Sequence, residues 1–411
     1  MSKIIELMAP AGDFESLNAA INSGANSIYF GIEQLNMRAK SSRNFQENDI
    51  EEIVSICKAN NVKSYITLNT IIYDHDLKFM QSIIKKAKDK GIDAIIAMDQ
   101  AVINFANEIG ISVHISTQIN ITNVETVKFY SKFADVIVLS RELSMKQIKY
   151  ICDSIVKQDI RGPLGELIKI EIFAHGALCM AVSGKCYMSL HTMNSSANRG
   201  ACMQNCRRRY KVTDLEDGHE LEIDNEYIMS PKDLSILDFL DQITALGIDV
   251  IKIEGRARSP EYVARVTKVY RQALDSISEG TFNPKKIEEW TKQLETVYNR
   301  GFWGGYYLGK NLGEWTNKSG SSATQTKAYL GKAIHYYPKA EIAHFKIESD
   351  KLCVGDDIFI IGRNTGVVES KIETLMVNDV FANEATKGQE CTFTLKTPIK
   401  PSDKLYKIIP S

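Results

Sequence analysis

A short pattern that marks the end of a helix and the start of a buried strand recurs along the first 250 residues. In each copy, Gly or Asn is followed by an apolar residue, a polar residue and a β-rich run, as at Gly24, Asn61, Gly91, Gly110 and Gly247. Gly and Asn tolerate the left-handed backbone that ends many helices. The pattern therefore predicts helices that each lead directly into a buried strand.

Amphipathic helix patterns stand before most of these sites. In the first of them Phe14, Leu17 and Ile21 share one face, and Asp13 is placed to cap the helix. Short apolar strands that alternate with helices form parallel sheets, and eight such units favour a closed (β/α)8 barrel of the TIM type. An open, doubly wound sheet is the alternative. The eight strands are expected at residues 4–8, 27–30, 65–69, 94–97, 113–116, 136–139, 169–174 and 250–253.

The chain between the seventh and eighth expected strands is much longer than the other connections. It holds a cysteine-rich insertion at residues 176–226. Loops that follow the strands build the active face of such a barrel. We therefore expect the insertion on the catalytic side.

The pattern of apolar and polar residues changes near residue 326. Alternating apolar and polar segments at 341–347, 357–361 and 392–395 are separated by turn signals such as Gly355-Asp356. This pattern predicts a small antiparallel β-barrel domain at 326–411. The α/β barrel and its insertion would then occupy residues 1–325.

The sequence contains no sign of export or of a membrane span. Its N-terminus lacks an apolar stretch of signal-peptide length, and no run of about 18 apolar residues occurs. We therefore expect a cytoplasmic protein, in which eight cysteines favour metal binding or catalysis over disulfides. The formal net charge is −1, so any surface that binds nucleic acid must be local.

Four of the eight cysteines gather in the insertion. Cys179, Cys186, Cys202 and Cys206 are separated by six, fifteen and three residues. A [4Fe–4S] cluster tolerates irregular spacing because loops can reach each of its corners, whereas a zinc site usually has tighter cysteine pairs. The spacing alone leaves a cluster, a zinc site or neither open. Four thiolates on a cluster would leave no open iron, so the cluster would transfer electrons or hold the loop.

Further candidates lie at the ends of the expected strands and in the insertion. His175 has the side chain best suited to acid–base chemistry near neutral pH. Arg141 and Arg256 can bind carboxylates or phosphates through two hydrogen bonds. Basic residues of the insertion, Arg199, Arg207 and Arg208 among them, form either a solvated charge run or a phosphate-binding patch. The peptidase motifs H-E-x-x-H and G-x-S-x-G do not occur.

Several segments resemble one known family. E-I-F-A-H-G-A-L-C at 171–179 and S-G-K-C-Y-M-S at 183–189 resemble the signature of peptidase family U32. L-M-A-P-A-G at 7–12, L-S-R-E-L at 139–143 and K-I-E-G-R at 252–256 resemble that family too. H-G-A-L-C-M-A at 175–181 and V-Y-R-Q-A at 269–273 are most similar to its prephenate-dependent tRNA uridine 5-hydroxylases.

The resemblance implies an enzyme that forms 5-hydroxyuridine at the wobble position of tRNA. It implies prephenate or a derived metabolite as cosubstrate, tRNA and a related U32 subunit as partners, and a [4Fe–4S] cluster on the four clustered cysteines. Other branches hydroxylate ribosomal RNA or a small-molecule ring, and the family name denotes collagenase-like peptidases. The catalytic candidates are His175, Glu142, Glu254 and Asn69. The substrate-binding candidates are Arg141, Arg256, Gln118, Lys252, Arg199, Arg207 and Arg208.

Overall fold

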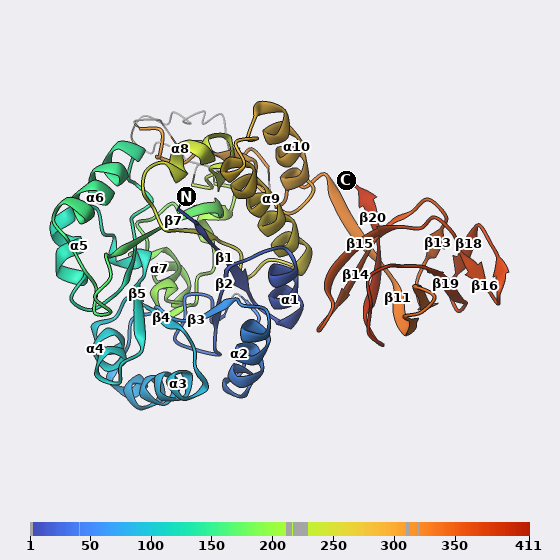
Figure 1. Cartoon of the computed structure of the whole chain (residues 1–411), viewed down its shortest axis with the longest axis horizontal. Helices are drawn as coiled ribbons and strands as arrows, with labels where there is room; N and C mark the ends of the chain where they lie inside the picture. The colour runs from blue at the N-terminus through green and yellow to red at the C-terminus, as the bar shows by residue number, and fades with distance from the viewer. Residues whose placement is uncertain (1–2, 41, 211–215, 217–228, 310–312, 319) are drawn as a thin grey trace.

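The computed structural model describes residues 3–40, 42–210, 216, 229–309, 313–318 and 320–411. Figure 1 shows two bodies within these residues, a barrel of strands ringed by helices and a separate sheet formed by the C-terminal part of the chain. The predicted insertion at residues 176–226 includes 211–215 and 217–226, which lie outside the described residues.

Eight parallel strands close into a barrel, as the sequence predicts. The first seven pair in chain order, and the eighth, β9, pairs with both β7 and β1, which closes the ring. The strands are β1 (Glu6–Ala11), β2 (Ser27–Gly31), β3 (Lys63–Leu68), β4 (Ala94–Ala97), β5 (Ser112–Ile115), β6 (Val136–Val138), β7 (Lys169–Gly176) and β9 (Val250–Ile253).

Helices cover the outside of the barrel (Figure 1). Asp13 caps the first by accepting a hydrogen bond from Ser16 N at 2.8 Å, and Gly91 ends the third with a φ of +81°. No helix in the described part of the chain is long and apolar enough to cross a membrane. The helices are α1 (Phe14–Asn22), α2 (Ile50–Ala59), α3 (Leu77–Lys90), α4 (Gln100–Glu108), α5 (Val124–Tyr130), α6 (Met145–Lys157), α8 (Leu240–Thr244), α9 (Pro260–Ser278) and α10 (Pro284–Glu295).

Two short strands extend the barrel sheet beyond the eight predicted ones. β8 (Asp233–Ser235) runs antiparallel to the end of β7, where His175 pairs with Ser235. β10 (Phe302–Trp303) then pairs in parallel with β8. Strands of three and two residues are too short to show the alternation on which the sequence prediction rests.

The C-terminal part of the chain forms a separate antiparallel sheet. Its strand order is β15-β14-β20-β11-β12-β19-β16-β17, and β13 (Lys351–Cys353) pairs with β18 (Glu384–Thr386) beside it. The antiparallel character that the sequence predicts is confirmed. The main strands are β11 (Gln325–Tyr337), β12 (Ile342–Ile347), β14 (Asp357–Gly362), β15 (Gly366–Lys371), β16 (Met376–Val377), β17 (Val380–Phe381), β19 (Glu390–Thr394) and β20 (Lys404–Pro410).

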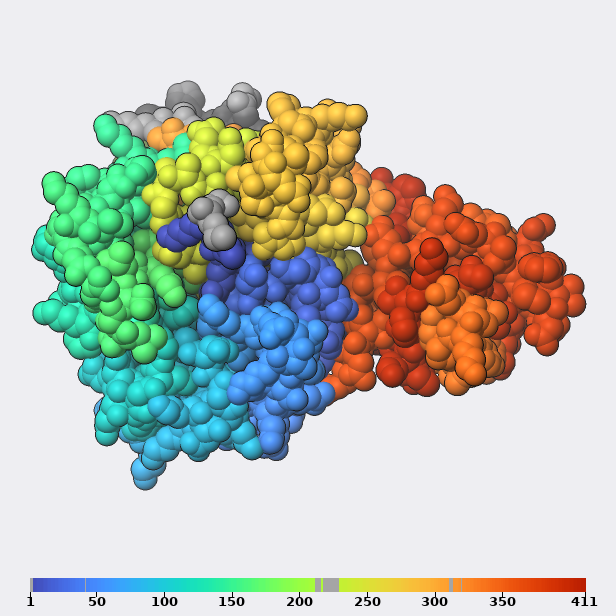
Figure 2. Space-filling model, in the orientation of Figure 1, coloured from blue at the N-terminus to red at the C-terminus, as the bar shows by residue number. Residues whose placement is uncertain are grey.

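The C-terminal sheet packs against α1 and α9 of the barrel (Figure 2). The guanidinium of Arg363 stacks on Phe14 at 3.4 Å from the ring centroid, and Asn18 Nδ2 donates to the Arg363 carbonyl at 2.7 Å. A Cβ on Gly366 would lie 2.7 Å from the backbone nitrogen of Ala19 in α1. Backbone-to-backbone approach of this kind fixes the sheet against the barrel.

We expect Gly366→Ala to destabilise this junction. Gly366 has a φ of +70°, and its nearest neighbours are atoms of the α1 backbone. Gly388 is a matched control because its φ is +94° and a Cβ added there would have no neighbour within 4 Å. The control change should cost about 1 kcal/mol through backbone strain alone, and Gly366→Ala about 1–3 kcal/mol more through the clash. If denaturant unfolding shows that the two variants lose the same free energy of unfolding, the tight junction is contradicted.

Candidate active site

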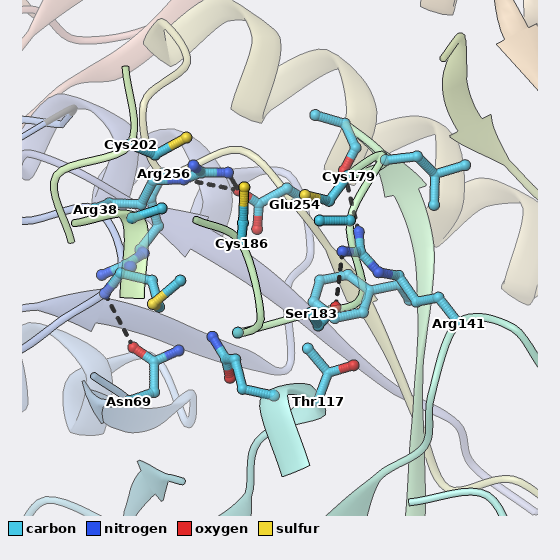
Figure 3. A pocket seen from close by; sticks show the side chains of 18 of the residues that line it. Arg38, Asn69, Thr117, Arg141, Cys179, Ser183, Cys186, Cys202, Glu254 and Arg256 are labelled. Carbon is cyan, nitrogen blue, oxygen red and sulfur yellow. Dashed lines mark hydrogen bonds and ion pairs between the residues drawn. The ribbon is translucent and has the colours of Figure 1, made fainter. Parts of the chain in front are cut away.

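A cavity of about 290 Å³ opens where the barrel strands end (Figure 3). Residues from the connections after β2, β3, β5, β6, β7 and β9 line it together with the cysteine-rich insertion. This is the face on which barrel enzymes build their active sites. The placement of the insertion on the catalytic side, expected from the sequence, agrees with this geometry.

Positively charged side chains far outnumber negatively charged ones in the lining of the cavity. Among the described residues that line it, Glu254 is the single carboxylate. Like charges that share a partly closed space repel one another, and an anionic ligand relieves that repulsion. The cavity therefore suits ligands with carboxylate or phosphate groups. The seven cations are Arg38, Arg141, Arg207, Lys252, Arg256, Arg258 and Arg300.

Glu254 forms an ion pair with Arg38 inside the cavity (Figure 3). Arg38 donates from Nη2 at 2.7 Å and from Nε at 3.2 Å to one carboxylate oxygen, and the Tyr29 hydroxyl donates to the other at 3.3 Å. Burial alone would raise the pKa of Glu254, but Arg38 and two further arginines outweigh it and lower the pKa to about 2. Glu254 is therefore an ionised hydrogen-bond acceptor near neutral pH.

Arg256 is held without a carboxylate in hydrogen-bonding contact. It is 5% exposed and donates from Nη1 to Asn36 Oδ1 at 3.0 Å and to Thr67 Oγ1 at 2.8 Å. Burial lowers the pKa of Arg256 to about 10, so the side chain stays charged near neutral pH. A buried guanidinium with neutral partners is suited to bind an anion that enters the cavity.

Arg141 joins the barrel to the insertion. It donates to the Ala177 carbonyl at 3.2 Å and to Ser183 Oγ at 3.1 Å, and its guanidinium lies 5.1 Å from the Phe173 ring centroid. These acceptors are neutral, so the charge of Arg141 is also available to a ligand.

Lys252 carries the charge at the base of the cavity. It donates to Glu171 at 2.9 Å, and its Nζ lies 4.4 Å from the Tyr29 ring centroid. Burial would raise the pKa of Glu171, but Lys252 and His114 outweigh it, so the carboxyl pKa falls below its usual value. The barrel interior thus contains a buried ion pair that opens to the cavity at Lys252.

The four clustered cysteines line this same cavity, and Figure 3 shows three of them around Glu254 and Arg256. Burial raises the pKa of the Cys206 thiol, and the charges of the other three thiols act in the same direction. Among the described residues, no group of three or more His, Cys, Asp or Glu side chains is arranged to hold a single metal ion. A [4Fe–4S] cluster binds thiolates at separate corners. Four thiols on one cavity fit its donor chemistry, and the cluster and the zinc site both stay predictions.

A model of peptidase family U32 matches residues 12–317. The chain belongs to this family. A collagenase of Porphyromonas gingivalis is 54% identical over 98% of this chain and 97% of its own length. The tRNA hydroxylation protein P1 of Bacillus subtilis is 28% identical over 99% of this chain and 96% of its own length. A 23S rRNA 5-hydroxycytidine synthase of Escherichia coli is 36% identical over 67% of this chain and 40% of its own length.

In this U32 chain, six of the strand-end candidates line the cavity. Asn69 is one of them, and its Oδ1 accepts a hydrogen bond from the Met37 backbone at 3.2 Å. Gln118 is another, with 6% exposure and a hydrogen bond from Ser116 Oγ. The six are Asn69, Gln118, Arg141, Lys252, Glu254 and Arg256.

Two catalytic candidates lie outside the cavity lining. Glu142 is exposed and does not belong to the described lining residues. His175 is 2% exposed and packs among Tyr262, Tyr270 and Phe302. Burial, with a smaller effect of a nearby arginine, lowers the pKa of His175 to about 3, so its ring is neutral near neutral pH. The structure does not bring either side chain into the cavity with the other candidates.

The three arginines predicted in the insertion have different surroundings. Arg199 pairs with Asp76, donates to the Ile71 carbonyl at 2.8 Å and does not line the cavity. Arg208 is exposed and outside the lining. Arg207 lines the cavity, but its guanidinium donates hydrogen bonds to Ser230 and to the Pro231 carbonyl. They do not form one continuous patch.

Several residues of the cavity were not predicted from the sequence. Arg38 lies seven residues beyond β2, in a connection that carries no strand-end signal. Arg258 lies in the connection between β9 and α9, and Arg300 lies just before β10. Both contact Tyr298, at 3.6 and 5.1 Å from its ring centroid. Only the positive charge of these side chains could have singled them out in the sequence.

Lys252→Met should destabilise the folded protein by about 3–5 kcal/mol, because it leaves the Glu171 carboxylate buried without its partner. Glu171 has no exposed surface, and one of its oxygens already lacks a hydrogen-bond partner. The double variant Lys252→Met with Glu171→Leu should recover most of the loss. Denaturant unfolding of the single and double variants measures the destabilisation by Lys252→Met and its recovery in the double variant. A double variant as unstable as Lys252→Met would contradict the energetic coupling between Lys252 and Glu171.

Glu254 should contribute stability that depends on pH. Its pKa is about 2 in the folded protein against 4.5 for the free side chain, so its contribution is fully present above pH 4.5 and is lost as the pH falls toward 2. We therefore expect the difference in unfolding free energy between wild type and Glu254→Gln to shrink over this range. A difference that stays constant between pH 5 and pH 3 would contradict the ion pair with Arg38.

Proposed function

We propose that this chain is an RNA hydroxylase that forms 5-hydroxyuridine at the wobble position of tRNA. Prephenate, or a metabolite derived from it, would be the cosubstrate, and a [4Fe–4S] cluster the cofactor. The observation that carries the proposal is the cavity, whose lining places seven cations and four thiols around one carboxylate. An anionic nucleotide and a dicarboxylate both fit this excess of positive charge.

The size of the cavity supports a compact substrate. At about 290 Å³ it lies at the lower end of the range for small-molecule sites. An enzyme that acts on a base must take that base out of its stack, so a site for one base is what the chemistry requires. Two of the relatives, in Bacillus subtilis and Escherichia coli, are named for hydroxylation of RNA.

The chain's own residues have distinct tasks in this proposal. Arg256 and Arg141 hold the carboxylates of the cosubstrate, because their present partners are neutral. Lys252 keeps a positive charge at the base of the cavity, and the ionised Glu254 accepts hydrogen bonds.

The cluster would be held by the four clustered cysteines of the insertion. Ligated by four thiolates, it would supply electron transfer rather than an open iron. These ligands are Cys179, Cys186, Cys202 and Cys206.

A collagenase-like peptidase is the second candidate, because the relative from Porphyromonas gingivalis carries that name. A serine or cysteine peptidase needs a base within hydrogen-bonding reach of its nucleophile. Among the described residues that line the cavity there is no histidine and no aspartate, and Ser183 contacts Arg141 instead of a base. The cavity therefore favours the hydroxylase.

Nucleoside mass spectrometry of total tRNA from a deletion strain tests the proposal. We expect 5-hydroxyuridine and its derivatives to disappear, and to return with the wild-type gene but not with Cys179→Ala. Cys353→Ala, in β13 of the C-terminal part of the chain and outside the cavity lining, is the matched control and should restore the modification. An unchanged tRNA profile in a strain without a related gene would refute the tRNA assignment.

A further inference from the structure

Arg207 connects the two ends of the cysteine set. It directly follows Cys206, and its Nη2 donates to the carbonyl of Leu178, the residue before Cys179. The first and fourth cysteines are far apart in the sequence, so this hydrogen bond fixes their segments next to each other.

The same guanidinium also anchors both segments to the rest of the barrel. Its Nη1 donates to the Pro231 carbonyl at 2.6 Å and to Ser230 Oγ at 3.0 Å. Ser230 is 1% exposed and precedes β8, which itself pairs with the end of β7. Three acceptors from two segments thus hold one side chain, and few of its donors remain for an RNA phosphate.

The charge of Arg207 lies close to the thiols. Arg207 directly follows Cys206 in the chain and lines the same cavity as all four clustered cysteines. In a partly buried site the interaction between a fixed cation and nearby thiolates is stronger than in water. Removal of this charge would leave the thiolates less stabilised.

We propose that Arg207 is a positioning residue for the iron–sulfur cluster and sets its reduction potential. This inference rests on the proposed function, because it requires the cluster. The side chain holds the segments of Cys179 and Cys206 together and places a positive charge beside them. Reduction adds negative charge to a cluster, so a fixed cation nearby favours the reduced state and raises the potential.

The test compares full-length wild type, Arg207→Gln, Arg207→Lys and Arg208→Gln, all purified without oxygen. Arg208→Gln is the matched control, because Arg208 is adjacent, exposed and outside the cavity lining. Iron and acid-labile sulfide per chain measure occupancy, and a redox titration followed by the cluster's absorbance measures the potential.

We expect Arg207→Gln to lower cluster occupancy several-fold and to shift the remaining cluster to a more negative potential. Arg207→Lys keeps the charge but not the planar set of donors, so its potential should stay near that of wild type while its occupancy falls. Arg208→Gln should match wild type in both. A merely structural role would lower the occupancy of both variants and leave the potential of both unchanged, so a shift in Arg207→Gln that is absent in Arg207→Lys identifies the role of the charge.

The possible failures are distinct. Wild type that binds no cluster under these conditions would refute the proposed cofactor and with it this inference. Wild type with a cluster, and Arg207→Gln with equal occupancy and potential, would overturn the role of Arg207 and leave the proposed function standing.

Discussion

The rest of the site depends on one constraint, which is that several positive charges must be held around one small cavity. The fold meets it by giving individual cations local partners. Arg38 pairs with Glu254 at 2.7 Å, and Lys252 pairs with Glu171 at 2.9 Å. Arg256 instead relies on neutral oxygens. These ion pairs lower the repulsion between the cations, and an anionic ligand interacts with the positive charge that remains.

Two other cations of the cavity connect the insertion to the barrel. Arg141 donates to Ala177 and Ser183, and Arg207 donates to Leu178 and to the segment before β8. Lys40, in the connection after β2, adds a backbone hydrogen bond to the Gly200 carbonyl at 3.1 Å. The loops that carry the thiols therefore owe their position to residues that also shape the cavity, so binding in the cavity and the arrangement of the thiols are physically linked.

Much of the barrel could be predicted, because each helix end and buried strand leaves a local signal. Asp13 and Gly91 mark helix ends in the sequence and cap helices in the structure. Barrel closure also brings strand ends together, which is why Lys252 and Arg256 were found as candidates. Side-chain direction leaves no such signal. His175 lies near the end of its strand, as predicted, yet faces a cluster of aromatic rings.

Contacts made by long connections were also not predictable from the sequence. Arg38 reaches Glu254 only because the segment after β2 folds back over the barrel, a tertiary contact that no local pattern encodes. β8 and β10 are likewise formed by pairing with a neighbour and not by their own sequences. The parts of the site that depend on long-range contacts are therefore the parts that sequence patterns describe least.

The most direct test of the account uses the purified, anaerobically prepared protein and tRNA isolated from a strain that lacks the gene. The measurement is 5-hydroxyuridine in that tRNA after incubation with and without prephenate, with gelatin cleavage assayed in parallel. We expect new 5-hydroxyuridine that depends on prephenate, and no cleavage of gelatin. Unchanged tRNA together with cleaved gelatin would contradict it.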